Sequence, residues 1–376
     1  MRSAFLLFGV WFAASVPEEG WKRGQALLAA GRPEEGALLL ESFASAPPQN
    51  AAALASLAAA YAAVEDERAE ATYRRAIALA PRNYPLRLEL VQALWRSERD
   101  TAGNEEMEKL IREAGTPRLR GFYGAQLMRQ HRFADAGREL QAACRGAVCG
   151  AEALESWASA LLETGRFEEA AARWREATAA GPGRLPARLG LARVLLLQGD
   201  PVSARRELER ARGDFPRSPE VRLELGRALE ALGETDAAES AYRKAIDLAP
   251  DLPRGRYALG TLLARKGREE EARREIALYQ EAFDSEQRER FQAGARRAEL
   301  NLGWTELAGG NAEKALKQFE RRPEDPEALR GQAAALSGLG RHAEAVGVLE
   351  RALAAAPSDS RIRYALERER RRAALR

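Results

Sequence analysis

The feature that most constrains this chain is a sequence pattern that recurs every 34 residues. Glycines, alanines and prolines each keep this interval through the middle of the sequence: Gly165, Gly199, Gly233 and Gly267; Ala170, Ala204, Ala238 and Ala272; Pro182, Pro216 and Pro250. Apolar residues recur at helical spacing on both sides of each glycine, and the proline closes the second segment. Each unit is therefore predicted to be two antiparallel helices joined at the glycine.

Units of this size must stack, because one helix pair cannot bury its apolar face alone. The chain has 376 residues, of which 31% are charged and 7% aromatic, a composition that suits a stack of amphipathic helices with solvated outer faces. About ten units fit between Pro17 and Pro357. Four of them keep the pattern less well, and they begin near Asn50, Tyr84, Pro117 and Arg296.

The small and large apolar residues of each unit follow the pattern W-x2-L-G-x2-Y, A-x3-F, P of the tetratricopeptide repeat family. The best matches are Leu225, Gly226, Leu229, Ala238, Tyr242 and Pro250; Leu259, Gly260, Leu263, Ala272 and Ile276; and Trp157, Ala158, Leu161, Ala170, Trp174 and Pro182. The chain thus resembles a tetratricopeptide repeat protein. This resemblance implies an all-α fold, a right-handed superhelical solenoid of about ten antiparallel helix pairs with a C-terminal capping helix, which binds partners in its concave groove.

The two ends of the sequence differ from the repeats. Residues 1–15, MRSAFLLFGVWFAAS, have a basic start, an apolar run and small residues at Ala13 and Ser15, as in a secretory signal peptide. An uncleaved N-terminal anchor and an ordinary first helix are the alternatives. We expect residues 16–357 to form the repeat array, residues 358–376 to form a basic C-terminal capping helix, and the protein to be extracytoplasmic, periplasmic or secreted.

Two segments depart from the regular pattern. Residues 280–295 add several positions without a proline, and Asp284 with Gln287 could cap a new, longer helix there. The C-terminal helix carries Arg370, Arg371 and Arg372 near its end. Its expected role is to cap the last apolar face, with electrostatic contact to anionic lipid or polymer as the alternative.

Few residues suit catalysis or cofactor binding. His131 and His342 both fall at or beside the turn between paired helices, without a natural partner for acid-base or metal chemistry. The sequence shows no phosphate loop, nucleophile elbow or cluster of metal ligands. The 59 basic and 56 acidic residues nearly balance, which argues against a dedicated nucleic-acid binder. We expect no enzyme activity, no cofactor and no metal.

Cys144 and Cys149 are close enough in sequence to form a disulfide in an exported protein. Two free thiols and a redox site are the alternatives that the sequence leaves open.

Partner binding is expected on the concave surface, because the inner helix of each unit usually lines the groove in the family. The resemblance points to seven exposed candidates: Trp95, Arg96, Arg129, Arg193, Arg227, Tyr257 and Trp304. Arg193 and Arg227 are one repeat apart and should stack, with Glu224 among the acids nearby. Such arginines either cover apolar surface and pair with those acids, or line a groove for an acidic peptide or glycan.

Three classes of function remain. The first is a non-catalytic scaffold or adaptor that binds envelope or secretion proteins. The second is an accessory protein that binds acidic polysaccharide or cell-wall polymer through an arginine-lined groove during export. The third is an enzyme or regulator whose activity leaves no sequence signal. Membrane contact is expected only through the N-terminal segment or the basic C-terminal helix.

Overall fold

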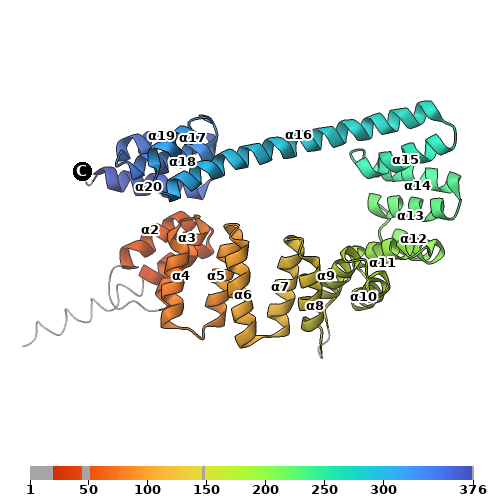
Figure 1. Ribbon diagram of the computed structural model, residues 1–376, viewed down its shortest axis with the longest axis horizontal. Helices are drawn as coiled ribbons and strands as arrows, with labels where there is room; N and C mark the ends of the chain where they lie inside the picture. The colour runs from red at the N-terminus through yellow and green to blue at the C-terminus, as the bar shows by residue number, and fades with distance from the viewer. Residues whose placement is uncertain (1–19, 45–50, 146–148, 375–376) are drawn as a thin grey trace, which may run out of the picture. The chain divides into compact units, whose positions relative to one another are not determined.

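The computed structural model describes residues 20–44, 51–145 and 149–374, and every regular element in these residues is a helix (Figure 1). The predicted signal segment, residues 1–15, lies outside the described residues. The chain divides into two compact units. We call residues 114–291 the middle unit and the described residues of 1–113 and 292–376 the terminal unit.

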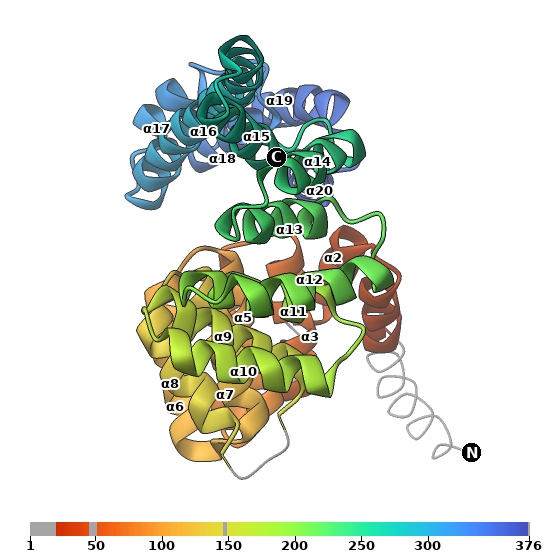
Figure 2. The same cartoon turned by 90° about the vertical axis from the view of Figure 1, so that its right-hand side faces the viewer.

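The middle unit contains α7 to α15 and the first part of α16. Their bounds are Pro117–Arg129 (α7), Phe133–Ala143 (α8), Ala151–Glu163 (α9), Phe167–Ala180 (α10), Leu185–Leu197 (α11), Pro201–Asp214 (α12), Pro219–Ala231 (α13), Thr235–Leu248 (α14), Pro253–Arg265 (α15) and Glu269–Ala308 (α16). Consecutive helices pack as antiparallel pairs, and each pair packs on the next. Figure 2 shows α9, α10, α11 and α12 in this arrangement.

The terminal unit combines the two ends of the sequence. It contains α2 to α6, the second part of α16, and α17 to α20. Their bounds are Pro33–Ala44 (α2), Ala51–Ala63 (α3), Arg68–Leu79 (α4), Tyr84–Arg96 (α5), Asp100–Ala114 (α6), Ala312–Phe319 (α17), Pro326–Gly338 (α18), His342–Ala355 (α19) and Ser360–Ala374 (α20). Residues 20–29 are also helical.

The predicted solenoid of helix pairs is confirmed, and the turns between paired helices show its period. Each turn has one residue with a positive φ, a conformation that favours glycine. Ten such turns occur in the described residues, at Gly31, Glu65, Glu98, His131, Gly165, Gly199, Gly233, Gly267, Gly310 and Gly340. The expected number of about ten units is therefore confirmed. Three of the four weaker units are those whose turn carries Glu or His in place of Gly.

The small residues of the pattern lie where helices approach closely. A Cβ atom added to Gly226 would lie 2.4 Å from the Tyr242 ring of the paired helix. Ala204 and Ala238 are completely buried. Ser218 and Asp325 accept hydrogen bonds from backbone N–H groups in the first turns of α13 and α18, as N-cap residues before a proline should.

The helix α16 differs from the expectation for residues 280–295. It continues unbroken from Glu269 to Ala308, so Asp284 and Gln287 cap no new helix, and that prediction is wrong. No proline ends this helix, and its residues therefore belong to both units. Its first part is the outer helix after the turn at Gly267, and its last part is the inner helix before the turn at Gly310.

Candidate partner-binding surface

The seven predicted groove residues are divided between the two units. Arg129, Arg193, Arg227 and Tyr257 belong to the middle unit, and Trp95, Arg96 and Trp304 to the terminal unit.

In the middle unit, the structure brings Arg193 and Arg227 together on one buried carboxylate. Arg193 Nε on α11 donates to Glu224 Oε1 on α13 at 2.6 Å, and Arg227 Nη1 lies 3.3 Å from Glu224 Oε2. The Glu224 side chain is 1% exposed, whereas both arginine side chains are 41% exposed. Both guanidinium groups are thus already paired with an internal acid. This arrangement favours the structural role for these arginines over a groove for acidic ligands.

A second arginine row also has a structural role. Arg188, Arg222 and Arg256 stand where the family pattern often has Trp. Each one donates to the backbone carbonyl of the proline six residues earlier, at 2.8, 3.5 and 2.7 Å respectively. Arg129 is exposed, but its guanidinium donates to Gln126 Oε1 of its own helix at 2.9 Å. These side chains hold the ends and faces of helices in place.

Among the predicted residues, Tyr257 is an aromatic side chain that is open to a partner. It is 51% exposed, although Leu189 and Leu223, at the same position of the two preceding repeats, are only 8% and 3% exposed. Its ring centroid lies 5.1 Å from that of Tyr279, which lies 5.9 Å from that of Phe283 on the same face of α16. We call Tyr257, Tyr279 and Phe283 the aromatic cluster.

Two members of this cluster, Tyr279 and Phe283, were not predicted from the sequence. Tyr279 and Phe283 are four residues apart, a spacing that places side chains on one face of a helix, and Phe283 is 41% exposed. In the sequence, two aromatic residues at this spacing in a segment without a proline could have indicated the cluster. Aromatic side chains exposed together are unusual on a protein surface and commonly mark contacts with partners.

Trp95 was expected to be exposed, and the structure corrects this. It is 9% exposed, its Nε1 donates to Asn104 Oδ1 at 3.0 Å, and it packs against Gly103 of the paired helix α6. Gly103 leaves room for the indole, which explains the burial. Trp95 therefore belongs to the core and cannot line a groove.

The other two candidates of the terminal unit have partners within it. Trp304 is half-buried, its ring lies edge-on to Phe319 at 5.1 Å, and the Arg330 guanidinium lies over its face at 4.7 Å. Arg96 is exposed near Tyr73 and Glu89. Burial raises the pKa of Tyr73, the Glu89 carboxylate adds to this, and Arg96 opposes it. Arg96 thus contributes to the electrostatics of a buried tyrosine.

The basic end of α20 is also largely paired. Arg370 lies 3.0 Å from Glu350 and 2.9 Å from Glu367, and Arg372 lies 3.0 Å from Glu369. Glu369 also lies 2.8 Å from His342 Nδ1, so His342 has a carboxylate partner that its sequence position did not predict. These pairs leave less free positive charge for an anionic polymer than the sequence indicated.

Cys144 and Cys149 are joined in a disulfide, with their Cα atoms 5.3 Å apart. They border a hollow of about 440 Å³ in which Arg173 covers the face of Trp157 at 4.7 Å and pairs with Glu176 at 2.9 Å.

No group of three or more His, Cys, Asp or Glu residues suited to hold a metal ion occurs in the described part of the chain. Within the same residues, no helix is long and apolar enough to cross a membrane.

The tetratricopeptide repeat family matches residues 161–223, 198–253, 223–287 and 326–368. These matches cover the regular repeats of the middle unit and the helices α18 to α20. The chain therefore contains tetratricopeptide repeats, as its sequence pattern indicated. Repeats of this family support a role as a protein-interaction scaffold.

No curated protein matches the chain. Among solved structures, it resembles MamA (residues 41 to the end) from Desulfovibrio magneticus RS-1, with 22% identity over 45% of this chain and 96% of that one and a TM-score of 0.41. It also resembles a tetratricopeptide repeat protein from Parabacteroides merdae ATCC 43184, with 13% identity, coverage of 76% and 98%, and a TM-score of 0.46. Neither similarity bears on what this chain binds.

Proposed function

We propose that this protein is a non-catalytic adaptor that binds other proteins, and that the aromatic cluster of the middle unit is its docking site. The observation that carries the proposal is the exposure of Tyr257 at a repeat position where Leu189 and Leu223 are buried. The stacked helices hold Tyr257, Tyr279 and Phe283 in place before binding. Rigid aromatic side chains lose little conformational entropy on binding and contribute much of the affinity at protein interfaces.

The partner expected here presents an apolar side chain to the cluster. The proposed site differs from the arginine-lined groove suggested by the sequence, because Arg193 and Arg227 are already bound to Glu224. A ligand carboxylate would have to compete with Glu224 for these groups. Displaced from both arginines, Glu224 would be a buried charge without a partner, which is costly.

Affinity capture tests the docking site. The parent protein and the double variant Tyr257→Ala, Phe283→Ala are used as baits in a cell-envelope extract. The matched control is Leu197→Ala, Val202→Ala, which removes two apolar side chains of the same unit that are 60% and 65% exposed. We expect the parent and the control to capture the same defined proteins and the cluster variant to lose them. Equal capture by all three baits would exclude the aromatic cluster as the docking site.

We also propose that the adaptor acts outside the cytoplasm, in the cell envelope. The support is the basic start, apolar run and small residues of residues 1–15. Cell fractionation combined with N-terminal sequencing of the purified protein tests this. A mature protein in the periplasmic or secreted fraction that begins near Val16 is the expected result. An intact protein in the cytoplasmic fraction would contradict the proposal.

A further inference from the structure

The last described helix, α20, packs against the first repeats of the chain as well as against its own neighbour in sequence (Figure 1). One of its faces places Ile362 and Leu366 in the apolar cluster of α18 and α19. The opposite face places Tyr364, which is 3% exposed, in a different cluster with Leu38, Leu40 and Tyr61. The helix thus joins two apolar clusters that come from opposite ends of the sequence.

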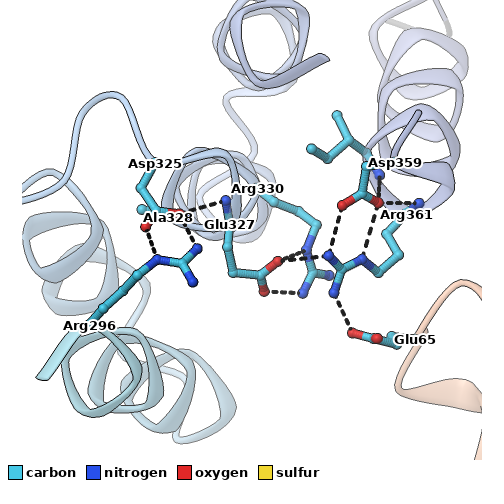
Figure 3. A network of polar contacts seen from close by, with 9 residues as sticks. Glu65, Arg296, Asp325, Glu327, Ala328, Arg330, Asp359 and Arg361 are labelled. Carbon is cyan, nitrogen blue, oxygen red and sulfur yellow. Dashed lines mark hydrogen bonds and ion pairs between the residues drawn. The ribbon is translucent and has the colours of Figure 1, made fainter. Parts of the chain in front are cut away.

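Charged side chains surround this contact, and each ion pair across it joins an arginine of α20 to an acid of the N-terminal helices. All the cations on α20 that reach the N-terminal helices are arginines, and their partners are acids of α2 and of the turn between α3 and α4. Arg363 pairs with Glu34, Arg361 with Glu65 and Arg368 with Asp66, each at 2.9 Å. Figure 3 shows Arg361 between Glu65 and the acids Asp359 and Glu327.

Two of the acids that lie against α20, Asp66 and Glu41, are also paired with Arg68 of the N-terminal helices. The Asp66 side chain is 4% exposed and accepts from Arg68 Nε at 2.8 Å. Arg68 also lies 2.7 Å from Glu41, which accepts from the Tyr364 hydroxyl at 2.9 Å. We call Glu34, Glu41, Glu65 and Asp66, with their apolar floor of Leu38, Leu40 and Tyr61, the acidic dock.

The helix α20 has the features of an inner repeat helix. Arg363 donates to the carbonyl of Pro357, six residues earlier, at 2.8 Å, as Arg188, Arg222 and Arg256 do in the middle unit. The helix α20 therefore resembles the first helix of a further repeat, which packs on the repeat beside it. The contact between α20 and the dock is heterologous, since a basic helix meets an acidic surface of a different sequence. Nothing in its geometry requires both surfaces to come from one chain.

We propose that the acidic dock and α20 form a head-to-tail interaction pair, which one chain closes on itself and which also joins two copies of this chain. The occupant of the dock in the joined form is α20 of the second copy. Within one chain the two surfaces are tethered, and tethering raises their effective concentration above that of the same surfaces on separate chains in dilute solution. The closed monomer is therefore expected to dominate in dilute solution, and exchange between copies to appear when closure is prevented or the protein is concentrated.

Two charge-reversal variants of the full chain test this proposal. The first reverses the dock with Glu34→Arg and Asp66→Arg. The second reverses the tail with Arg363→Glu and Arg368→Glu. Each variant alone has like charges across the contact, both within a chain and between its own copies. In a mixture, the native dock of one variant meets the native tail of the other, and the two reversed surfaces also match.

We expect light scattering after size exclusion to show monomers for each variant alone and a doubled mass for the mixture. A single chain with all four substitutions should return to the monomer and recover the melting temperature that each variant loses. A mixture that stays monomeric, while the four-fold variant recovers its stability, would overturn the proposal and leave α20 as a contact within one chain only.

A second experiment does not depend on the stability of these variants. In a background of Cys144→Ser and Cys149→Ser, Glu34→Cys and Arg363→Cys are placed in separate full-length chains. The two proteins are mixed at high concentration and treated with a short bis-maleimide. Cross-linked dimers that form in the mixture, and in neither protein alone, are expected. Equal yields in all three samples, or no dimers, would contradict the proposal.

Discussion

The middle and terminal units are built from helix pairs of the same kind, but their ion pairs join residues at very different separations in the sequence. In the middle unit, ion pairs join residues about one repeat apart, as between Arg193 and Glu224, 31 positions apart in the chain. In the terminal unit, Arg363 and Glu34 are 329 positions apart. The middle unit can form from neighbouring repeats alone, whereas the terminal unit must bring the two ends of the sequence together.

This difference has consequences for stability and folding. Contacts between adjacent repeats require little loop closure, so their chain-entropy cost is small and they form early. The contact between α20 and the acidic dock closes a loop of about 300 residues, so we expect it to form last and open first. The two units are therefore expected to respond separately to substitution.

The largest effect is expected in the middle unit, at the buried acid Glu224. Replacing Arg193 and Arg227 by methionine should cost about 3 kcal/mol, at the lower end of the range for an unpaired buried charge, because water can reach the space left by the half-exposed arginines. Urea unfolding measures the loss. Adding Glu224→Gln should restore most of it, since no buried charge then remains. An unchanged unfolding midpoint in the first variant would show that Glu224 does not depend on these arginines.

Matched substitutions compare the two units directly. Ala238 in the middle unit and Ala345 in the terminal unit occupy the same place in the repeat, and both are completely buried. Replacing either one by leucine should cost roughly 1 to 3 kcal/mol through overpacking. Hydrogen exchange should show faster opening only in the unit that carries the substitution. Faster opening in both units after either change would mean that they unfold together.

A smaller effect is expected for the disulfide of the middle unit. Closing so short a loop stabilises a protein by about 2 kcal/mol in the chain-entropy model. Cys144→Ser with Cys149→Ser should lower the unfolding midpoint accordingly, without changing the terminal unit. Alkylation of the unreduced parent should add no alkyl group to its mass. Two added groups would show that both thiols are free.

The smallest effect is a pH dependence in the terminal unit. Burial alone would raise the pKa of Asp66, but the hydrogen bonds and charge of Arg68, with the charge of Arg368, hold it below its ordinary value. A lowered folded-state pKa means that the stabilisation is complete above the ordinary value of about 3.9 and is lost as the pH falls through the folded-state value. The melting temperature of the terminal unit should therefore decrease as the pH is lowered from about 3.9 through the folded-state pKa of Asp66.

The variant Asp66→Asn provides the control for the pH prediction. It should melt at a lower temperature than the parent at neutral pH, and the difference between the two proteins should shrink below pH 4. A constant difference across this range would mean that Asp66 stabilises the unit by contacts that do not involve its charge.

The sequence predicted much of the fold and little of the site. The 34-residue period determined the helix pairs, the turn positions and the buried alanines. The same reasoning placed Trp95 on the surface, because a pattern of helix positions does not show that Gly103 leaves space for its ring. The repeat pattern identified Tyr257 but not Tyr279 and Phe283. These two residues lie in α16, which has neither the proline nor the repeat boundary that the regular pattern would place there.

By itself, the sequence therefore determined that this protein is a stack of tetratricopeptide helix pairs. Helical periodicity, small residues at close contacts and glycine at left-handed turns act over short distances and can be read along the chain. Only the tertiary structure decided that Arg193 and Arg227 share Glu224 and that α20 lies against the acidic dock. Such contacts depend on which surfaces, distant in the sequence, are buried together. Burying a charge costs free energy unless a partner of opposite charge lies beside it.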